Sequence, residues 1–291
     1  MRMVIAALLP VIIFAVYHFG TRALLHILIS VVACVLTQFT FEAFAGLHME
    51  TGDFSAVVTG IMIALMLPVG APLWAGAVGG IFAVAVVKML LGRLLKVRLN
   101  AALAGYLFLF LVFHDFMTDF TYGGFGGGSL LSQFMSGADV DPLPMVTGFT
   151  NGGIGLTSAA AILLGFVILL AAGVVSFQIP AFACAAFALT LTLLSGNGFD
   201  PLTLVIHACG GGFLFIICFM SVDYFSSPVT KWGRILYGII IGVLSAVLRY
   251  AGIEEAAVYA VLASNILVPL LEKFTVPRPF GHAGRLGVKG S

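Results

Sequence analysis

The sequence predicts an all-α, polytopic membrane protein with about ten transmembrane helices in two inverted five-helix repeats. Three observations lead to this prediction: the composition, the spacing of the apolar segments and the distribution of Lys and Arg. Of 291 residues, 61% are hydrophobic and 9% are charged, whereas an average soluble domain is about 45–50% apolar and about 25% charged. This composition excludes a water-soluble globule, a disordered chain, a coiled coil and a disulfide scaffold.

The apolar segments are close to the ~20 residues that a transmembrane helix needs, and breaking residues separate them. Gly20 to Arg22 ends the first segment, and His48 to Asp53 ends the second. Pro68 to Pro72 divides the third from the fourth, and Gly92 to Asn100 precedes the fifth. The spans expected in this half are 3–20, 22–47, 54–70, 72–92 and 100–116.

The second half has breaks of the same kind. They lie at Gly173 to Ser176, Gly196 to Pro201, Asp223 to Trp232 and Gly252 to Glu255. The expected spans are 152–174, 176–195, 202–221, 233–252 and 254–271. The predicted organisation is therefore a five-helix repeat over 1–116, an extracytoplasmic loop over 117–151, a second five-helix repeat over 152–275 and a cytoplasmic tail over 276–291.

The distribution of Lys and Arg supports this number of spans. If the N-terminus is cytoplasmic, only Arg22 and Arg249 fall on the outer side. The other eleven fall on the cytoplasmic side: Arg2, Lys88, Arg93, Lys96, Arg98, Lys231, Arg234, Lys273, Arg278, Arg285 and Lys289. Positive charges concentrate on the cytoplasmic side of membrane proteins, so we expect a multi-pass protein with both termini cytoplasmic.

Two stretches of the chain are similar to each other. Each has a helix, a proline-containing turn, an aromatic residue and a second, Gly-containing helix. The turn contains Pro68 and Trp74 in the first stretch, and Pro228 and Trp232 in the second. By the order of the spans the two copies run in opposite directions. Inverted repeats with interrupted helices are typical of proteins that move a solute or an ion across the membrane.

The outer loop and the bulk charge exclude some functions. The loop contains a Gly-rich patch over 123–128 and no Lys or Arg, so it lacks the lysine of a phosphate-binding P-loop; a flexible lid or hinge is expected instead. The net charge of +1 gives no reason to expect a nucleic-acid partner. Four isolated Cys in apolar segments indicate buried thiols, and no metal site is expected from this chain alone.

Several ionisable residues are candidates for chemistry. Asp223 is the most informative acid, because a carboxylate at the end of a span either caps nearby backbone N–H groups or faces an ion path; both interpretations stay open. Lys88 lies inside a span and is expected to extend to the cytoplasmic surface. Glu254 and Glu255 open the last span, where acids suit a helix N-terminus.

Four stretches resemble signatures of the RnfD/NqrB family, in the order in which the family has them. The most specific is Asp223-Tyr-Phe-Ser-Ser-Pro-Val-Thr-Lys-Trp-Gly-Arg234. The others are Asp53 to Pro68, Gly152-Gly-Ile-Gly-Leu-Thr-Ser158 and Val276-Pro-Arg-Pro-Phe-Gly281. The resemblance extends from Ile5 to Gly281 and implies ten helices in an inverted repeat.

The resemblance also implies a function. Members of the family are membrane subunits of Rnf and Na⁺-pumping NADH:quinone oxidoreductase complexes in the bacterial cytoplasmic (inner) membrane. These complexes move electrons between NAD(H) and ferredoxin or quinone and drive Na⁺ or H⁺ across the membrane. The implied partners are the lipid bilayer and the other membrane and peripheral subunits. The implied cofactors are FMN, joined through its phosphate to a threonine in an outer-face Ser-Gly-Ala-Thr motif, and riboflavin.

The sequence departs from the family at this flavin motif. The nearest match in the outer loop is Ser136, Gly137, Ala138 and Asp139, so an aspartate takes the place of the acceptor threonine. A carboxylate cannot form the same phosphodiester, and its charge would repel the flavin phosphate. Thr147 and Thr150 are the remaining candidate acceptors, in a different sequence context. We therefore expect FMN to be loosely bound or absent.

These observations favour a structural and ion-conducting subunit of an Rnf-like complex, with little or no chemistry by this chain alone. A stand-alone channel or transporter for a small solute, built on the same inverted repeat, is the main alternative. A component for vitamin or flavin uptake is a third hypothesis. Loss of the acceptor threonine would suit the stand-alone channel or transporter, which needs no redox cofactor.

Overall fold

The structure is a computed structural model that describes residues 1–45, 51–121, 128–196 and 200–275. The first half contains α1 (Arg2–Phe19), α2 (Thr21–Phe44), η1 (Thr51–Asp53), α3 (Ser55–Met66), α4 (Trp74–Ile81) with its π-helical continuation η2 (Phe82–Leu94), and α5 (Ala101–Val112). Three short helices follow, α6 (His114–Met117), α7 (Leu130–Met135) and α8 (Leu143–Thr147). The second half contains α9 (Ala159–Ala171), α10 (Gln178–Ser195), α11 (Pro201–Cys209), α12 (Phe213–Phe215), η3 (Ile216–Met220), α13 (Lys231–Tyr250) and α14 (Ala256–Thr275).

The structure supports a polytopic all-α membrane protein. Within the described residues, six helices are long and apolar enough to cross a membrane, and α11 with α12–η3 makes a seventh if the bent pair is one span. The helices α3, α5 and α9 are apolar but shorter. Every segment that the sequence predicted as a span contains a helix in its described residues, whereas the number of spans and the inverted repeat remain predictions. The Gly-rich patch over 123–127 and the tail from residue 276 lie outside the described residues.

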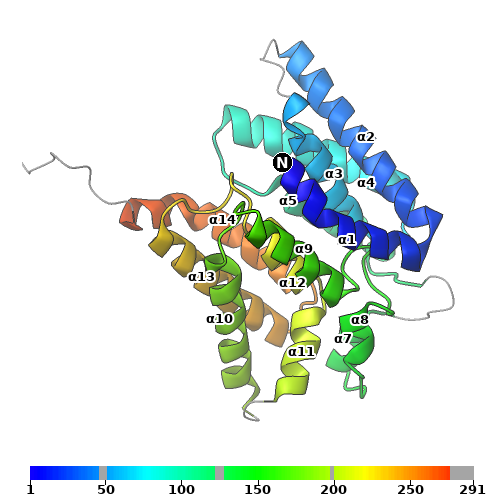
Figure 1. The fold of residues 1–291 in the computed structure, drawn as a ribbon, viewed down its shortest axis with the longest axis vertical. Coiled ribbons are helices and arrows are strands. Elements are labelled where there is room, and N and C mark those ends of the chain that lie inside the picture. The colour runs from blue at the N-terminus through cyan, green and yellow to red at the C-terminus, as the bar shows by residue number, and fades with distance from the viewer. Residues whose placement is uncertain (46–50, 122–127, 197–199, 276–291) are drawn as a thin grey trace, which may run out of the picture.

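The two halves lie side by side, with α1 and α9 in contact at their centre (Figure 1). In the first half α2 packs along α4, where Gly76 and Gly80 face α2 closely. In the second half α10 packs along α13 in the same way, at Gly238 and Gly242. Small residues four apart allow helix backbones to approach closely in membranes. The second and fourth predicted spans of each half are therefore paired alike, α2 with α4 and α10 with α13.

The sixth predicted span begins later than expected, at Ala159. The residues before it form an irregular segment because they satisfy the carbonyls at the end of α3, which are left free by the break at Pro68. The Ile154 N–H donates to the Leu67 carbonyl at 2.8 Å, and the Gly155 N–H donates to the Leu65 carbonyl at 2.6 Å. This segment joins the two halves near the predicted outer side.

The eighth predicted span is broken. Its two parts, α11 and α12–η3, meet at 67° across Gly210 to Gly212. Gly211 and Gly212 have φ values of 57° and 65°, in the left-handed region where a side chain would be strained. The three glycines therefore cause the break, and α11 ends with its last carbonyls inside the protein.

Candidate functional site

Two groups of buried and half-buried polar side chains lie between the helices. The first, the Arg249 cluster, consists of Tyr106, Ser129, Arg249, Glu254 and Glu255 and lies beside the α11–α12 break. The second, the Lys88 cluster, consists of Gln38, Glu42, Ser55, Lys88 and Arg93 and lies where α2, α3 and η2 meet. Ionisable side chains inside membrane proteins are costly and usually mark an ion path or a partner. These two clusters are therefore the candidate functional sites.

In the Arg249 cluster, the guanidinium of Arg249 is buried, with 1% of the residue exposed. Its Nη2 donates a hydrogen bond of 3.3 Å to the Gly210 carbonyl at the end of α11. Its Nε and Nη1 have no hydrogen-bond partner in the described part of the protein. The arginine is thus anchored through one nitrogen to the backbone of the broken helix.

The acids of the Arg249 cluster come from the start of α14. The hydroxyl of Tyr106, on α5, donates to Glu255 Oε1 at 2.9 Å, whereas Glu255 Oε2 has no partner among the described residues. The hydroxyl of Ser129 donates to Glu254 Oε2 at 3.1 Å. The cluster therefore connects the last helix, the break at Gly210 and the outer loop.

A small cavity of about 40 Å³ opens beside this cluster. Its lining comes from the outer loop, from the irregular segment before α9 and from the α11–α12 break. It includes Ser129, Thr150, Asn151, Thr157, and Gly210 to Gly212. A buried water needs roughly 10–15 Å³ of such volume, and organic ligands occupy about 300–1,000 Å³. The cavity therefore has room for an ion with a few waters and is too small for a flavin ring.

In the Lys88 cluster, hydrogen bonds form a continuous chain. The Lys88 ammonium donates to Gln38 Oε1 at 2.7 Å and also to the Ser55 hydroxyl. Gln38 Nε2 donates to Glu42 Oε1 at 2.9 Å, and Arg93 lies 3.5 Å from the same oxygen. Gln38 and Glu42 are 1% and 0% exposed. The Lys88 ammonium is thus bonded to Gln38 on α2 and to Ser55 at the start of α3, and the expected extension of Lys88 to the cytoplasmic surface stays a prediction.

Asp223 lies in the turn between η3 and α13, near the Lys88 cluster. Its Oδ2 accepts a hydrogen bond of 3.3 Å from the Ser226 hydroxyl, and its own carbonyl accepts from the Ser227 N–H at 3.0 Å. Lys88 is close enough to interact with its charge. The turn contacts suit the cap interpretation, and the role of Asp223 in an ion path stays a prediction.

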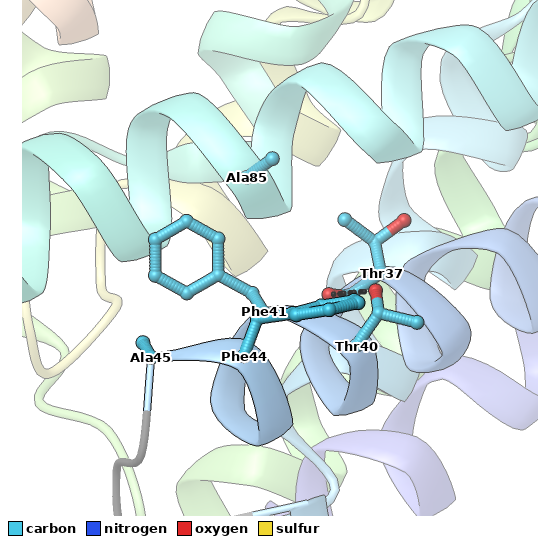
Figure 2. A pocket seen from close by; sticks show the side chains of 6 residues that line it. All are labelled: Thr37, Thr40, Phe41, Phe44, Ala45 and Ala85. Atoms are coloured by element: carbon cyan, nitrogen blue, oxygen red, sulfur yellow. Dashed lines mark hydrogen bonds between the residues drawn. The ribbon is translucent and has the colours of Figure 1, made fainter.

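A second hollow is an open groove between the end of α2 and η2, shown in Figure 2. It is lined by Thr37, Thr40, Phe41, Phe44, Ala45 and Ala85. The hydroxyls of Thr37 and Thr40 donate to backbone carbonyls of α2, so they offer little to a ligand. This groove carries no chemistry of its own.

Comparison with known proteins decides the family. The sequence profile described as the NQR2, RnfD, RnfE family matches residues 1–281. The chain belongs to this family. A relative from Acetobacterium woodii, named as the D-type subunit of the Na⁺-translocating ferredoxin:NAD⁺ oxidoreductase complex, is 36% identical over 97% of this chain and 90% of its own length.

Two further relatives are similar to this protein over nearly the whole chain. One from Methanosarcina acetivorans, named as the D-type subunit of an ion-translocating oxidoreductase complex, is 31% identical over 95% of this chain and 90% of its own length. One from Clostridium ljungdahlii, named as the D-type subunit of a proton-translocating ferredoxin:NAD⁺ oxidoreductase complex, is 29% identical over 94% of this chain and 89% of its own length. The names of these relatives include both Na⁺ and protons as the ion.

The flavin motif expected from the RnfD/NqrB resemblance lies at the surface, in the outer loop. Ser136 to Asp139 are exposed and follow the end of α7. The Thr147 hydroxyl is exposed and donates to the Leu143 carbonyl, and Thr150 is buried. Asp119, in the same loop, stays anionic, because hydrogen bonds from the Thr121 hydroxyl and N–H lower its pKa. The expected absence of a covalently attached flavin at these residues stays a prediction.

The cysteines do not provide a metal site either. The structure leaves all four thiols free, with Cys34 and Cys218 buried. In the described ranges, no three His, Cys, Asp or Glu side chains gather closely enough to hold a metal ion.

Sequence reasoning missed the Arg249 cluster. It placed Arg249 at the outer surface and treated Glu255 as an ordinary acid at a helix start, although both are buried. A usable signal was present, because Arg249 follows a long apolar helix and lies only six positions before Glu255. What could not be anticipated is Tyr106, which reaches the same point from a distant helix.

Proposed function

We propose that this chain is the D-type membrane subunit of an Rnf-like complex, which couples electron transfer between NAD(H) and ferredoxin or quinone to the movement of Na⁺ or H⁺. The observation that carries this proposal is the similarity to the D-type subunit of the Acetobacterium woodii complex over 97% of the chain. The apolar helices support the membrane location. The chain acts with other subunits, because its relatives are named as subunits of ion-translocating oxidoreductase complexes.

The role proposed for this subunit is ion conduction. Charged groups within a helical membrane protein face a cavity, a partner or an ion path, and both polar clusters and Asp223 are groups of this kind. Asp223, at the predicted cytoplasmic end of the broken eighth segment, is proposed to line the path there. The proposed location is the bacterial cytoplasmic membrane, with both termini in the cytoplasm.

The proposed subunit carries no covalent FMN. Asp139 occupies the place of the acceptor threonine, and the described part of the outer loop contains no Lys or Arg to offset a phosphate charge. The exposed hydroxyls of Ser136 and Thr147 donate to backbone carbonyls. Electron transfer in the complex would then depend on cofactors held by the partner subunits.

The flavin state can be measured directly. The chain is produced with its own complex and flavin transferase, separated on a denaturing gel and weighed as an intact protein. We expect a non-fluorescent band with the unmodified mass. The matched variant Asp139→Thr restores the family motif in the same loop, and we expect it to gain fluorescence and the mass of one FMN. A fluorescent wild-type band would contradict the proposal.

Membership of a complex is tested by purification from the native membrane. A tagged chain should be recovered with the other subunits in a fixed ratio, and the preparation should reduce NAD⁺ with reduced ferredoxin. Recovery of the chain alone, together with uptake of a small solute into vesicles that contain only this chain, would instead support the stand-alone transporter. The absent acceptor threonine is the observation that favours that alternative.

A further inference from the structure

We propose that the break between α11 and α12 is a binding site for a Na⁺-sized monovalent cation, that the Arg249 guanidinium holds this site in the present conformation, and that Glu255 receives the guanidinium when the cation enters. This inference rests on the proposed ion-translocating function. It deepens that function by naming the cation site, the Arg249 guanidinium that competes with the cation for it, and the Glu255 carboxylate that binds the guanidinium when the cation is present.

The break has the donor atoms that such a cation needs. α11 ends inside the protein at Gly210. Besides the bond from Arg249, the Gly210 carbonyl accepts only a long turn hydrogen bond of 3.4 Å from the Phe213 N–H among the described residues. Broken helices of this kind coordinate Na⁺ through exposed carbonyls and C-terminal helix ends. The Thr157 hydroxyl lines the same cavity, is 4% exposed and has no partner among the described residues. Carbonyl and hydroxyl oxygens suit a hard cation.

Arg249 occupies the place of that cation. Its guanidinium bonds to the Gly210 carbonyl at 3.3 Å and lies directly against Gly211. A Cβ at Gly211 would be 2.5 Å from Nη1 and 2.7 Å from Nη2, so only glycine lets the guanidinium lie there. The remaining nitrogens Nε and Nη1 make no hydrogen bonds to the described residues. A guanidinium has five N–H donors, and in this position only one of them makes a hydrogen bond within the described structure, and that bond is long. Little free energy is therefore lost when the guanidinium leaves this position.

Glu255 supplies the second position. Its Oε1 is held by Tyr106, but its Oε2 is buried and lacks a hydrogen bond within the described structure. Arg249 and Glu255 interact electrostatically, yet no ion pair within 4.0 Å joins them in the described residues. With Glu254 included, one cation faces two carboxylates, so the ionised cluster has room for one more positive charge. His207, whose Nδ1 has no partner among the described residues, and Tyr259 are further titratable groups nearby.

These contacts define two states. In the present state the guanidinium neutralises the carbonyl end of α11. In the other state it forms an ion pair with Glu255 Oε2, and the incoming cation binds the Gly210 carbonyl and the Thr157 hydroxyl. No covalent bond changes. The cavity of about 40 Å³ leaves space for an ion with few waters.

The test is equilibrium binding of ²²Na⁺ to the purified whole complex. Because Arg249→Met removes the competing cation but keeps an unbranched side chain, we expect at least tenfold tighter ²²Na⁺ binding. Arg249→Lys keeps the charge and should stay within threefold of wild type. Glu255→Gln removes the receiving carboxylate and should weaken binding at least tenfold. Because Arg249→Met leaves Glu255 unpaired and can impair folding, the double variant Arg249→Met/Glu255→Gln is included, and we expect it to bind more tightly than Glu255→Gln alone.

Arg22→Met is the matched control. Arg22 also donates to backbone carbonyls at a helix break, those of Gly70 and Ala71 at 3.2 Å each, and its loss should leave ²²Na⁺ binding unchanged. Each variant is accepted only if it copurifies with the other subunits. Equal ²²Na⁺ affinity in wild type, Arg249→Met and the double variant, or no ²²Na⁺ binding at all, overturns this site. If the wild-type complex nevertheless couples electron transfer to ion movement, the proposed function stands without this site. If the wild-type complex does not couple them, the proposed function itself fails.

Discussion

At the scale of single residues, the interior cations of this protein are held in two different ways. Lys88 donates to the buried Gln38 on α2 and to the half-buried Ser55 on α3, and Gln38 links it to Glu42. Arg249 has one backbone bond and two nitrogens without partners in the described structure. Breaking the contacts of a charged group costs more free energy when the group has all its hydrogen bonds than when it has only one weak bond. The first cluster is therefore suited to holding the fold, and the second to changing state.

Asp223 gives a prediction at the same scale. Asp223→Asn removes a charge near the Lys88 cluster but keeps the size of the side chain and its ability to accept from Ser226. If Asp223 lines the ion path, ion accumulation per electron transferred should fall about tenfold, while electron transfer itself changes less than twofold. The measurement compares NADH formation with ion uptake in vesicles that contain the complex.

Ser226→Ala is the control for this prediction. It removes the hydroxyl that bonds to Asp223 at 3.3 Å and leaves the carboxylate in place. A purely structural cap predicts that both variants lower thermal stability and leave the ratio of ions to electrons unchanged. That pattern would contradict a role for Asp223 in the ion path.

At the scale of helices, close glycine contacts determine the pairing of the long elements. A Cβ at Gly242 would lie 2.3 Å from the Ala183 carbonyl, and one at Gly238 would lie 2.8 Å from the Ile179 carbonyl. These distances are shorter than real Cβ contacts, so a larger residue must push α13 away from α10. Helix association in membranes depends on such packing, because lipid is as apolar as the side chains.

Gly242→Leu tests this interface. We expect the variant to lose most of its yield as an assembled complex and to lower the temperature at which the purified protein aggregates by about 10 °C or more, since overpacking a close contact is destabilising. Val243→Leu on the same helix is the control, since Val243 is 37% exposed on the outside, and it should behave like wild type. An assembled, thermally stable Gly242→Leu protein would show that α10 and α13 do not pack at this glycine.

The helices were predictable from the sequence, and the breaks only in part. Hydropathy and breakers located every long helix, because apolar runs of this length can satisfy their backbone in lipid only as helices. The split of the eighth segment at Gly210 to Gly212 was not anticipated, since hydropathy does not register backbone dihedrals. The irregular residues before Ala159 were likewise assigned to a span, because their bonds to Leu65 and Leu67 come from a distant part of the chain.

The candidate site was less predictable than the fold. Asp223 could be singled out because an acid at the end of an apolar run is conspicuous. Arg249 was assigned to the surface from its position near a helix end, and nothing local shows that Tyr106 and Gly210 enclose it. Buried polar clusters are assembled by tertiary contacts between distant helices, whereas charge counts along a chain report only which side of the membrane a loop favours.

At the scale of the whole molecule, the protein has the features of one part of a larger assembly. The described residues hold charged clusters between helices, expose apolar faces such as that of α2 and form a cavity of about 40 Å³ beside the Arg249 cluster. Family membership over residues 1–281 places this chain among membrane subunits. The central claim is therefore that ion movement by the complex requires this chain.

One measurement tests that claim most directly. Inverted membrane vesicles are prepared from cells that have the chain, cells that lack it and cells in which it is restored, and each is supplied with reduced ferredoxin and NAD⁺. NADH formation and the uptake of Na⁺ and H⁺ are recorded together. The account predicts that ion uptake disappears without the chain and returns when it is restored. Ion uptake that persists at the wild-type rate without the chain would contradict it.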